Sequence, residues 1–230
     1  MTDPHGAQAR IGSASDHGQT IGCGLLVTPR HVITCAHVAA QGLGTEATDP
    51  QAPAGNLPVD LPLLEHPFRT IGRVVHWVPV REATNKDPED IAVLELDQEA
   101  PPEAEPARLI SKEPNEYTGL EVHCFGFPAG IHEGVRRHGT CRGENARGWV
   151  QLDVARGSVA GGFSGTGAWT RTPDGAVGLV VAARVAERYA ALIPTRTLFV
   201  ACPELDTSWR PRNPYKSLNA FGPEDHADFP

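Results

Sequence analysis

Short apolar segments rich in β-branched residues alternate with turns along the whole chain. They occupy residues 21–28, 31–34, 70–80, 91–96, 120–125, 149–154, 177–183 and 189–193. Each has the length and composition of a β-strand, and Gly, Pro and Asp punctuate the intervals between them. Only residues 195–201 suggest a short helix. The pattern predicts an all-β protein.

Two intervals between these strands are longer than a turn. Residues 42–62 are rich in Gly, Pro, Ala and Asp and are expected to form an irregular loop. Residues 97–116 carry Pro and Glu at high density, which favours a connection between two subdomains. Two sets of short strands divided in this way suit a pair of small β-barrels, at about residues 10–105 and 117–203 of one domain spanning 1–205.

Composition and charge narrow the function classes. With 40% hydrophobic and 21% charged residues, the 230-residue chain is typical of a soluble globular protein. The net charge of -8 and the scattered Lys and Arg argue against nucleic acid as a direct partner. No apolar run is long enough to cross a membrane, and the N-terminus lacks the features of a secretory signal. We therefore expect a cytoplasmic protein with no membrane partner.

The five cysteines include no Cys-x-x-Cys pair, so buried reduced thiols are expected. Cys124, His132, His138 and Cys141 are the residue types that bind zinc, but their spacing matches no compact zinc motif. The sequence thus predicts neither a metal nor a cofactor.

Three segments carry the residue types needed for acyl transfer to a serine: a base, an anion that orients it, and a nucleophile in a tight turn. His37 follows an apolar strand, Asp90 precedes another, and Ser164 lies in Gly161–Gly167, a segment with several glycines. Taken singly, each has an ordinary structural explanation, as a core histidine, a strand-opening acid or a glycine turn. Their order along the chain and their flanking strands make the combination specific.

The flanking motifs resemble the His, Asp and Ser boxes of the trypsin and chymotrypsin superfamily and its bacterial HtrA-like relatives. They are GLLVTPRHVITCAHV, EDIAVLEL, and GGFSGTGAW followed by AVGLVVAA. The resemblance covers roughly residues 10–205. It implies two six-stranded antiparallel barrels with the active site between them, and a serine endopeptidase acting on proteins or peptides.

The resemblance also implies the residue roles. Ser164 is the expected nucleophile, His37 its general base and Asp90 the acid that orients His37, whereas Asp87 lacks the strand that would place it beneath the imidazole. The amides of Gly162 and Ser164 match the oxyanion hole. Phe163 stands where digestive relatives have an Asp that captures a new N-terminus, so activation by N-terminal trimming is not expected. Cys35 is expected to be a packed thiol, because the disulfide found beside the family's histidine has no counterpart.

The same alignment places the primary substrate pocket at Ser158, Val181, Ala182 and Ala183. Ser158 at its base brings no formal charge, which disfavours cleavage after Lys or Arg. A small or apolar residue before the scissile bond is expected, or an acidic one if Arg184 or Arg188 points inward.

The C-terminal residues 206–230 read as a linker followed by NPYKSLNAFGPEDHADFP. This segment resembles the opening of bacterial STAND-type NTPase modules, whose proteins are associated with antiviral defence, and it stops before any phosphate-binding loop. The resemblance implies that the peptidase is the regulated effector domain of a longer protein, covalently linked to a downstream NTPase and sensor. An ordinary polar tail is the alternative.

Two other functions remain open from the sequence. One is a catalytically inactive, protease-like interaction module, although His37, Asp90 and Ser164 are all present. The other is a constitutive quality-control peptidase of the HtrA type, which usually carries an export signal and a peptide-binding domain.

Overall fold

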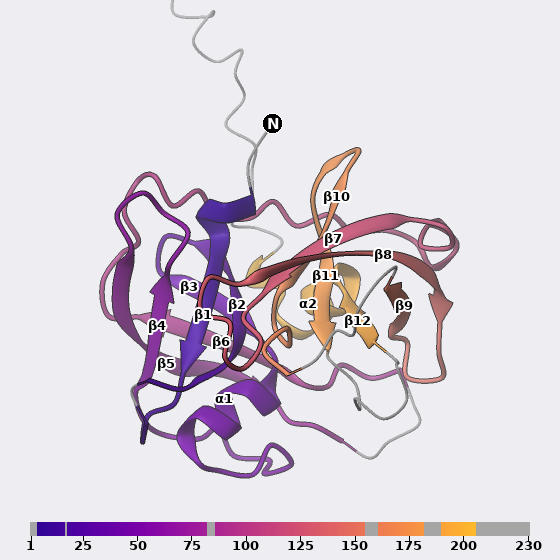
Figure 1. Ribbon diagram of the computed structural model, residues 1–230. Coiled ribbons are helices and arrows are strands. Elements are labelled where there is room, and N and C mark those ends of the chain that lie inside the picture. Colours follow the sequence, from indigo (N-terminus) through magenta and orange to yellow (C-terminus); the bar gives the residue numbers. More distant parts are fainter. Residues whose placement is uncertain (1–3, 17, 82–85, 155–160, 182–189, 206–230) are drawn as a thin grey trace, which may run out of the picture.

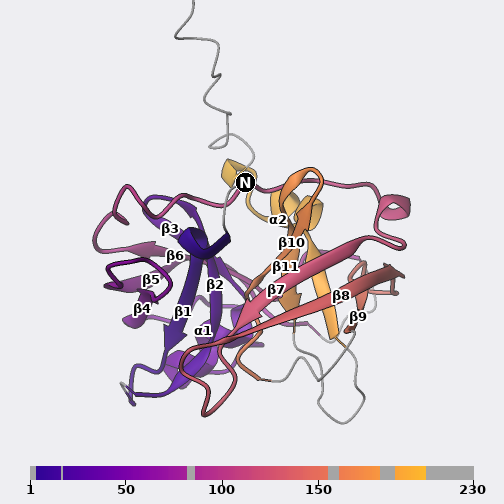
Figure 2. The same cartoon turned by 45° about the horizontal axis from the view of Figure 1, so that its top comes forward.

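The computed structural model describes residues 4–16, 18–81, 86–154, 161–181 and 190–205. Within these ranges the strands form two closed antiparallel barrels that lie side by side (Figures 1 and 2). No helix among the described residues is long and apolar enough to cross a membrane.

The first barrel contains the strands of the N-terminal half, ordered β1-β2-β3-β6-β5-β4 around the ring. Their bounds are β1 Gln8–Gly12, β2 Thr20–Thr28, β3 His31–Thr34, β4 Leu57–Leu61, β5 Phe68–Val78 and β6 Ile91–Leu96. Alternation is clear in β4, where Leu57, Val59 and Leu61 are buried and the residues between them are not. This period of two directs one side of each strand into the barrel core.

The second barrel repeats the same strand order, β7-β8-β9-β12-β11-β10. Its strands are β7 Glu121–Gly126, β8 Val135–Glu144, β9 Val150–Val154, β10 Gly167–Arg171, β11 Asp174–Val181 and β12 Ala190–Pro194. The predicted fold class, two six-stranded antiparallel barrels, is confirmed.

Several elements differ from the sequence expectation. The predicted loop at 42–62 contains β4, whose five residues include a proline. Strands β1, β8 and β10 were not predicted; β8 alternates exposed Arg and His with small residues rather than with large apolar ones. Helix α1, Ala36–Leu43, was also missed, whereas the helix expected at 195–201 is α2, Thr195–Ala201. Two single-turn helices, η1 Pro4–Ala7 and η2 Pro114–Glu116, complete the described elements.

The segment expected to connect the two halves is held against both barrels. Ala107 donates its amide to Leu26 O of β2, at 2.8 Å, and Ile110 donates to Ala176 O of β11, also at 2.8 Å. Within this segment, Ala104 and Ala107 are buried. These hydrogen bonds tie the barrels together on the side where the chain passes from one to the other.

Candidate active site

His37 and Asp90 are brought together by the pairing of β3 with β6. Thr34 at the end of β3 pairs with Ala92 near the start of β6. Because the strands are antiparallel, the chain that leaves β3 meets the chain that enters β6, so the first turn of α1 faces Asp90. A rigid sheet edge therefore positions both side chains.

The two residues are joined by three hydrogen bonds. His37 Nδ1 lies 2.8 Å from Asp90 Oδ2 and 3.0 Å from Oδ1, and the His37 backbone amide donates to Oδ1 at 2.9 Å. The Asp90 side chain is only 2% exposed, whereas the His37 side chain is 31% exposed. With Nδ1 donating to the carboxylate, the tautomer leaves Nε2 as the ring atom able to accept a proton.

The environment tunes the imidazole in two opposing ways. Burial lowers the pKa of His37, but the charge and hydrogen bonds of Asp90 raise it by more, so the net shift is upward. The Asp90 carboxylate thus stabilises the imidazolium form that a general base passes through.

Asp90 has a left-handed backbone, with φ of 59°, the one such non-glycine residue in the described ranges. Asp tolerates this region better than most residues, at a cost of about 1–2 kcal/mol. The preceding residue, Glu89, anchors the turn: its buried carboxylate accepts the Arg81 amide at 3.0 Å and pairs with Arg147 Nη1 at 3.4 Å. Sequence reasoning gave Glu89 no role, although two adjacent acids before a buried strand were a usable signal.

The Ser164 loop requires glycine at two positions. Gly162 and Gly165 have φ of 95° and 86°, and a Cβ on either would lie 2.1 Å from a backbone oxygen, Phe127 O or Cys23 O respectively. Only glycine adopts such a conformation at such close approach. The glycine-rich sequence is therefore demanded by the shape of this loop.

Hydrogen bonds fix the Ser164 loop to both barrels. Cys23 of β2 donates its amide to Ser164 O at 2.8 Å, and Gly165 donates to Val180 O of β11 at 2.9 Å. Ser164 is 5% exposed. A Cβ placed on Gly22 would lie 3.0 Å from Ser164 O and 2.8 Å from the Val38 side chain. The serine backbone thus lies against the start of β2, close to the residue that follows His37.

Phe163, which precedes Ser164, is fully buried in the core of the second barrel. Its ring lies against Gly126, and the guanidinium carbon of Arg137 is 5.9 Å from the ring centroid. An apolar side chain anchors the loop here.

The predicted substrate pocket is described only in part. Val181 is the last residue of β11 and is 6% exposed. Ser158, Ala182, Ala183, Arg184 and Arg188 lie outside the described residues.

The cysteines are buried free thiols, including the packed thiol predicted at Cys35. Cys35 is the N-cap residue of α1, and its sulfur, a ring nitrogen of His37 and an oxygen of Asp90 lie within 4.8 Å of one another. These groups could hold a metal, but the Asp90 carboxylate is already bonded to His37. Cys124, His132, His138 and Cys141 form no metal-ligand cluster in the described part of the chain.

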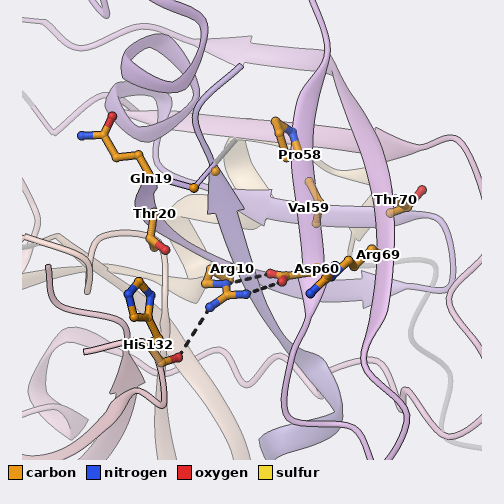
Figure 3. Close-up of a pocket in the computed structure, with 11 residues that line it drawn as sticks. Arg10, Gln19, Thr20, Pro58, Val59, Asp60, Arg69, Thr70 and His132 are labelled. Carbon is orange, nitrogen blue, oxygen red and sulfur yellow. Dashed lines mark hydrogen bonds and ion pairs between the residues drawn. The ribbon is translucent and has the colours of Figure 1, made fainter. Parts of the chain in front are cut away.

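A separate pocket of about 330 Å³ opens beside the start of β2 (Figure 3). Arg10 crosses it, bonding through Nε to Asp60 Oδ1 at 3.0 Å and through Nη1 to His132 O at 3.5 Å. The same guanidinium lies 5.3 Å from the Phe127 ring centroid. Arg10 therefore links the first barrel to the β7–β8 loop of the second, a contact that the sequence did not indicate.

Known structures share this architecture. An inactive form of the Rv3671c protease from M. tuberculosis has a TM-score of 0.58 at 17% identity, covering 88% of this chain and 90% of that one. Its active form has a TM-score of 0.59 at 18% identity, covering 88% and 82%. A serine endoprotease from Yersinia pestis has a TM-score of 0.61 at 16% identity, covering 88% and 63%. At these identities the likeness is one of fold.

The comparison with curated proteins gave no match. The model of the trypsin-like peptidase domain family matches residues 22–179, which include His37, Asp90 and Ser164. Since this match spans more than half of the sequence, the chain belongs to the trypsin-like peptidase domain family.

Proposed function

We propose that the protein is a serine endopeptidase in which Ser164, His37 and Asp90 form the catalytic triad. The observation that carries the proposal is the His37–Asp90 pair: a buried carboxylate bonded to Nδ1 and to the backbone amide of the same histidine. The Ser164 loop, fixed against the neighbouring end of β2, supports it. Neither feature is needed to close a barrel.

The mechanism follows from these groups. The Ser164 hydroxyl attacks the scissile carbonyl while His37 Nε2 takes the hydroxyl proton, and Asp90 stabilises the resulting imidazolium. The imidazolium then gives the proton to the leaving amine, which departs and leaves an acyl-enzyme. Water, deprotonated by His37, hydrolyses the acyl-enzyme and restores Ser164. Protein groups alone supply this chemistry, without a cofactor.

The amides of Gly162 and Ser164 are the proposed oxyanion donors. The Gly162 carbonyl belongs to the peptide between the two that carry these donors, and it accepts the Phe127 amide at 2.9 Å and the Cys23 thiol at 3.1 Å. These two bonds fix the middle peptide of the loop, which limits the motion of the donor peptides on either side of it. Val181 at the end of β11 is the proposed start of the substrate pocket.

We further propose a regulated role for this peptidase, as the effector domain of a longer defence or signalling NTPase. The support is the sequence of residues 213–230 alone. If the domain is a regulated effector, its peptidase activity should be low in isolation and higher in a triggered full-length protein. Equal activity in both would instead favour a constitutive peptidase.

A fluorophosphonate probe tests the peptidase proposal directly, because it labels only a serine activated by a base. We expect the triggered full-length wild-type protein to be labelled and its Ser164→Ala variant to be unlabelled. The matched control is Ser13→Ala, which removes another buried serine, in the turn after β1, and should keep full labelling. Labelling that persists in Ser164→Ala would assign the activated nucleophile to another serine. Absence of labelling in the triggered full-length wild-type protein would favour an inactive interaction module.

A further inference from the structure

A second group of potential metal ligands lies away from the active site. A ring nitrogen of His76, the sulfur of Cys202 and a carboxylate oxygen of Glu204 all lie within 4.8 Å of one another. His76 belongs to β5 of the first barrel, whereas Cys202 is the C-cap residue that follows α2, and Glu204 comes two residues later. The cluster is formed only because the C-terminal end of the described chain packs against the first barrel.

One nitrogen of the His76 ring has no hydrogen-bond partner among the described residues. This atom, Nε2, is shielded from solvent. A buried imidazole nitrogen without a partner is unfavourable, so such groups normally have a ligand, a water or a protein partner. Coordination of a cation gives the ring that partner.

The Cys202 thiol supplies the sulfur ligand of this cluster. It is fully buried and lies beside the His76 ring and the Glu204 carboxylate. The thiolate is the form of cysteine that binds a metal. A bound cation compensates for the thiolate charge, and the thiol proton is released to solvent on binding.

The donor set indicates which metal fits. A thiolate, an imidazole and a carboxylate together select zinc over the oxygen-seeking Ca²⁺ and Mg²⁺. Zinc bond lengths place tetrahedral ligand atoms roughly 3.3–3.7 Å apart. The spacing here, at most 4.8 Å, would have to contract by about 1 Å. Glu204 is exposed, with rotatable side-chain bonds that allow this adjustment.

We propose that His76, Cys202 and Glu204 bind one zinc ion, with water as the fourth ligand. The ion joins the first barrel to the segment that follows the last strand of the second. His76 pairs with Val93, and β6 begins directly after Asp90, so the site anchors the strand pair that supports the catalytic acid. This proposal does not depend on peptidase activity.

Cobalt titration of the 230-residue chain is the direct test, because Co²⁺ bound to a thiolate in a tetrahedral site has characteristic visible and charge-transfer absorption. We expect one equivalent of Co²⁺ to bind with these bands and Zn²⁺ to displace it. His76→Gln and Cys202→Ala should weaken Zn²⁺ binding by at least about 100-fold, more than the loss of an outer partner costs. Glu204→Gln should weaken it less.

The control is Cys35→Ala, which removes the thiol of the active-site cluster. This variant should bind Co²⁺ and Zn²⁺ as the wild type does. Thermal unfolding gives a second readout: Zn²⁺ at about 100 times its Kd should raise Tm by roughly 5–10 °C in wild type and not in His76→Gln. If Cys202→Ala fails to fold, His76→Gln, which alters a partly exposed side chain, still decides the question. Loss of the cobalt bands in Cys35→Ala but not in Cys202→Ala, or the absence of thiolate bands in wild type, would overturn the proposal.

Discussion

The clusters Cys35–His37–Asp90 and His76–Cys202–Glu204 contain the same three functional groups, with ligand atoms within 4.8 Å in each. They differ in hydrogen bonding. In the first, Asp90 bonds to the ring and the backbone of His37, and the Cys35 thiol lies 3.7 Å from Val180 O. In the second, His76 has a buried nitrogen without a partner among the described residues.

The difference shows that hydrogen bonding, more than the kinds of residue present, decides what such a cluster can do. A carboxylate bonded to a histidine orients the ring and raises its basicity, which suits proton transfer. A ring with an unsatisfied nitrogen beside a buried thiol suits a cation. The following predictions test whether this distinction holds.

The largest effect is expected where the bonded cluster is broken. Asp90→Asn keeps the shape of the side chain but removes the charge that fixes the His37 tautomer. We expect kcat to fall by about 10⁴-fold, as for the corresponding change in the chymotrypsin template. The measurement is turnover of a peptide substrate that the wild type cleaves, with folding checked by circular dichroism.

The control for this change is Asp97→Asn, which removes an acid that pairs with Arg73 on the surface. It should leave kcat unchanged. An Asp90→Asn enzyme within tenfold of the wild-type kcat would show that another group orients His37.

A second prediction concerns pH. In the proposed mechanism the neutral form of His37 is the base, and Asp90 raises the pKa of its ring above the ordinary value despite burial. Activity should therefore fall about tenfold per pH unit below that raised pKa. In Asp90→Asn the charge that raises the pKa is absent while burial remains, so the acidic limb of residual kcat/KM should move to lower pH. An unmoved limb would mean that a group other than His37 controls it.

The same shift affects folding with a definite sign. Because the folded-state pKa of His37 is raised, its protonation favours the folded state. This contribution is full below the unfolded pKa and is lost as pH rises through the folded pKa. Comparing denaturant unfolding of wild type and Asp90→Asn across that window measures it; equal pH slopes would contradict the assignment.

A smaller effect is expected at the Glu89–Arg147 pair, which anchors the turn before Asp90. Arg147→Gln removes the cation beside the buried Glu89 carboxylate, leaving it the Arg81 amide. Arg147 is 38% exposed, so water partly replaces it, and we expect about 1–2 kcal/mol of destabilisation. Because Glu89 precedes the left-handed Asp90, kcat should fall by roughly tenfold, with KM unchanged.

The matched control is Arg142→Gln, on the same β8–β9 hairpin, whose partner Asp153 lies on the surface. Neither stability nor kcat should change. If the two variants behave alike, the Glu89–Arg147 pair has no special part in positioning Asp90.

The fold and the His37–Asp90 pair could be predicted from the sequence because both depend on local patterns. The apolar run before His37 and the one after Asp90 became β3 and β6, and their register brings the two residues together. The structure likewise explains the glycines around Ser164 through Gly162 and Gly165. By contrast, β8 was missed because its outward face is Arg and His, and its inward positions Gly139 and Cys141 are small.

The remaining features depend on contacts between distant segments, which no local pattern encodes. Glu89 meets Arg147 only after both barrels have closed, and Arg10 reaches His132 across the barrel interface. His76 and Cys202 are likewise far apart in sequence. The zinc alternative considered from the sequence combined cysteines and histidines that lie close along the chain, whereas the proposed zinc site joins β5 of the first barrel to residues after α2.

The smallest effect is expected at Cys35, the residue that gives the two clusters the same composition. Its thiol is fully buried and its hydrogen bond to Val180 O, at 3.7 Å, is weak, while the Asp90 carboxylate is already bonded to His37. Cys35→Ala should therefore change kcat by less than about threefold and cost about 1 kcal/mol of stability through lost packing. Peptide turnover and denaturant unfolding measure both. A large loss of kcat with stability preserved would mean that the thiol helps to hold Asp90, and that the active-site cluster is a three-residue unit rather than a bonded pair beside a packed sulfur.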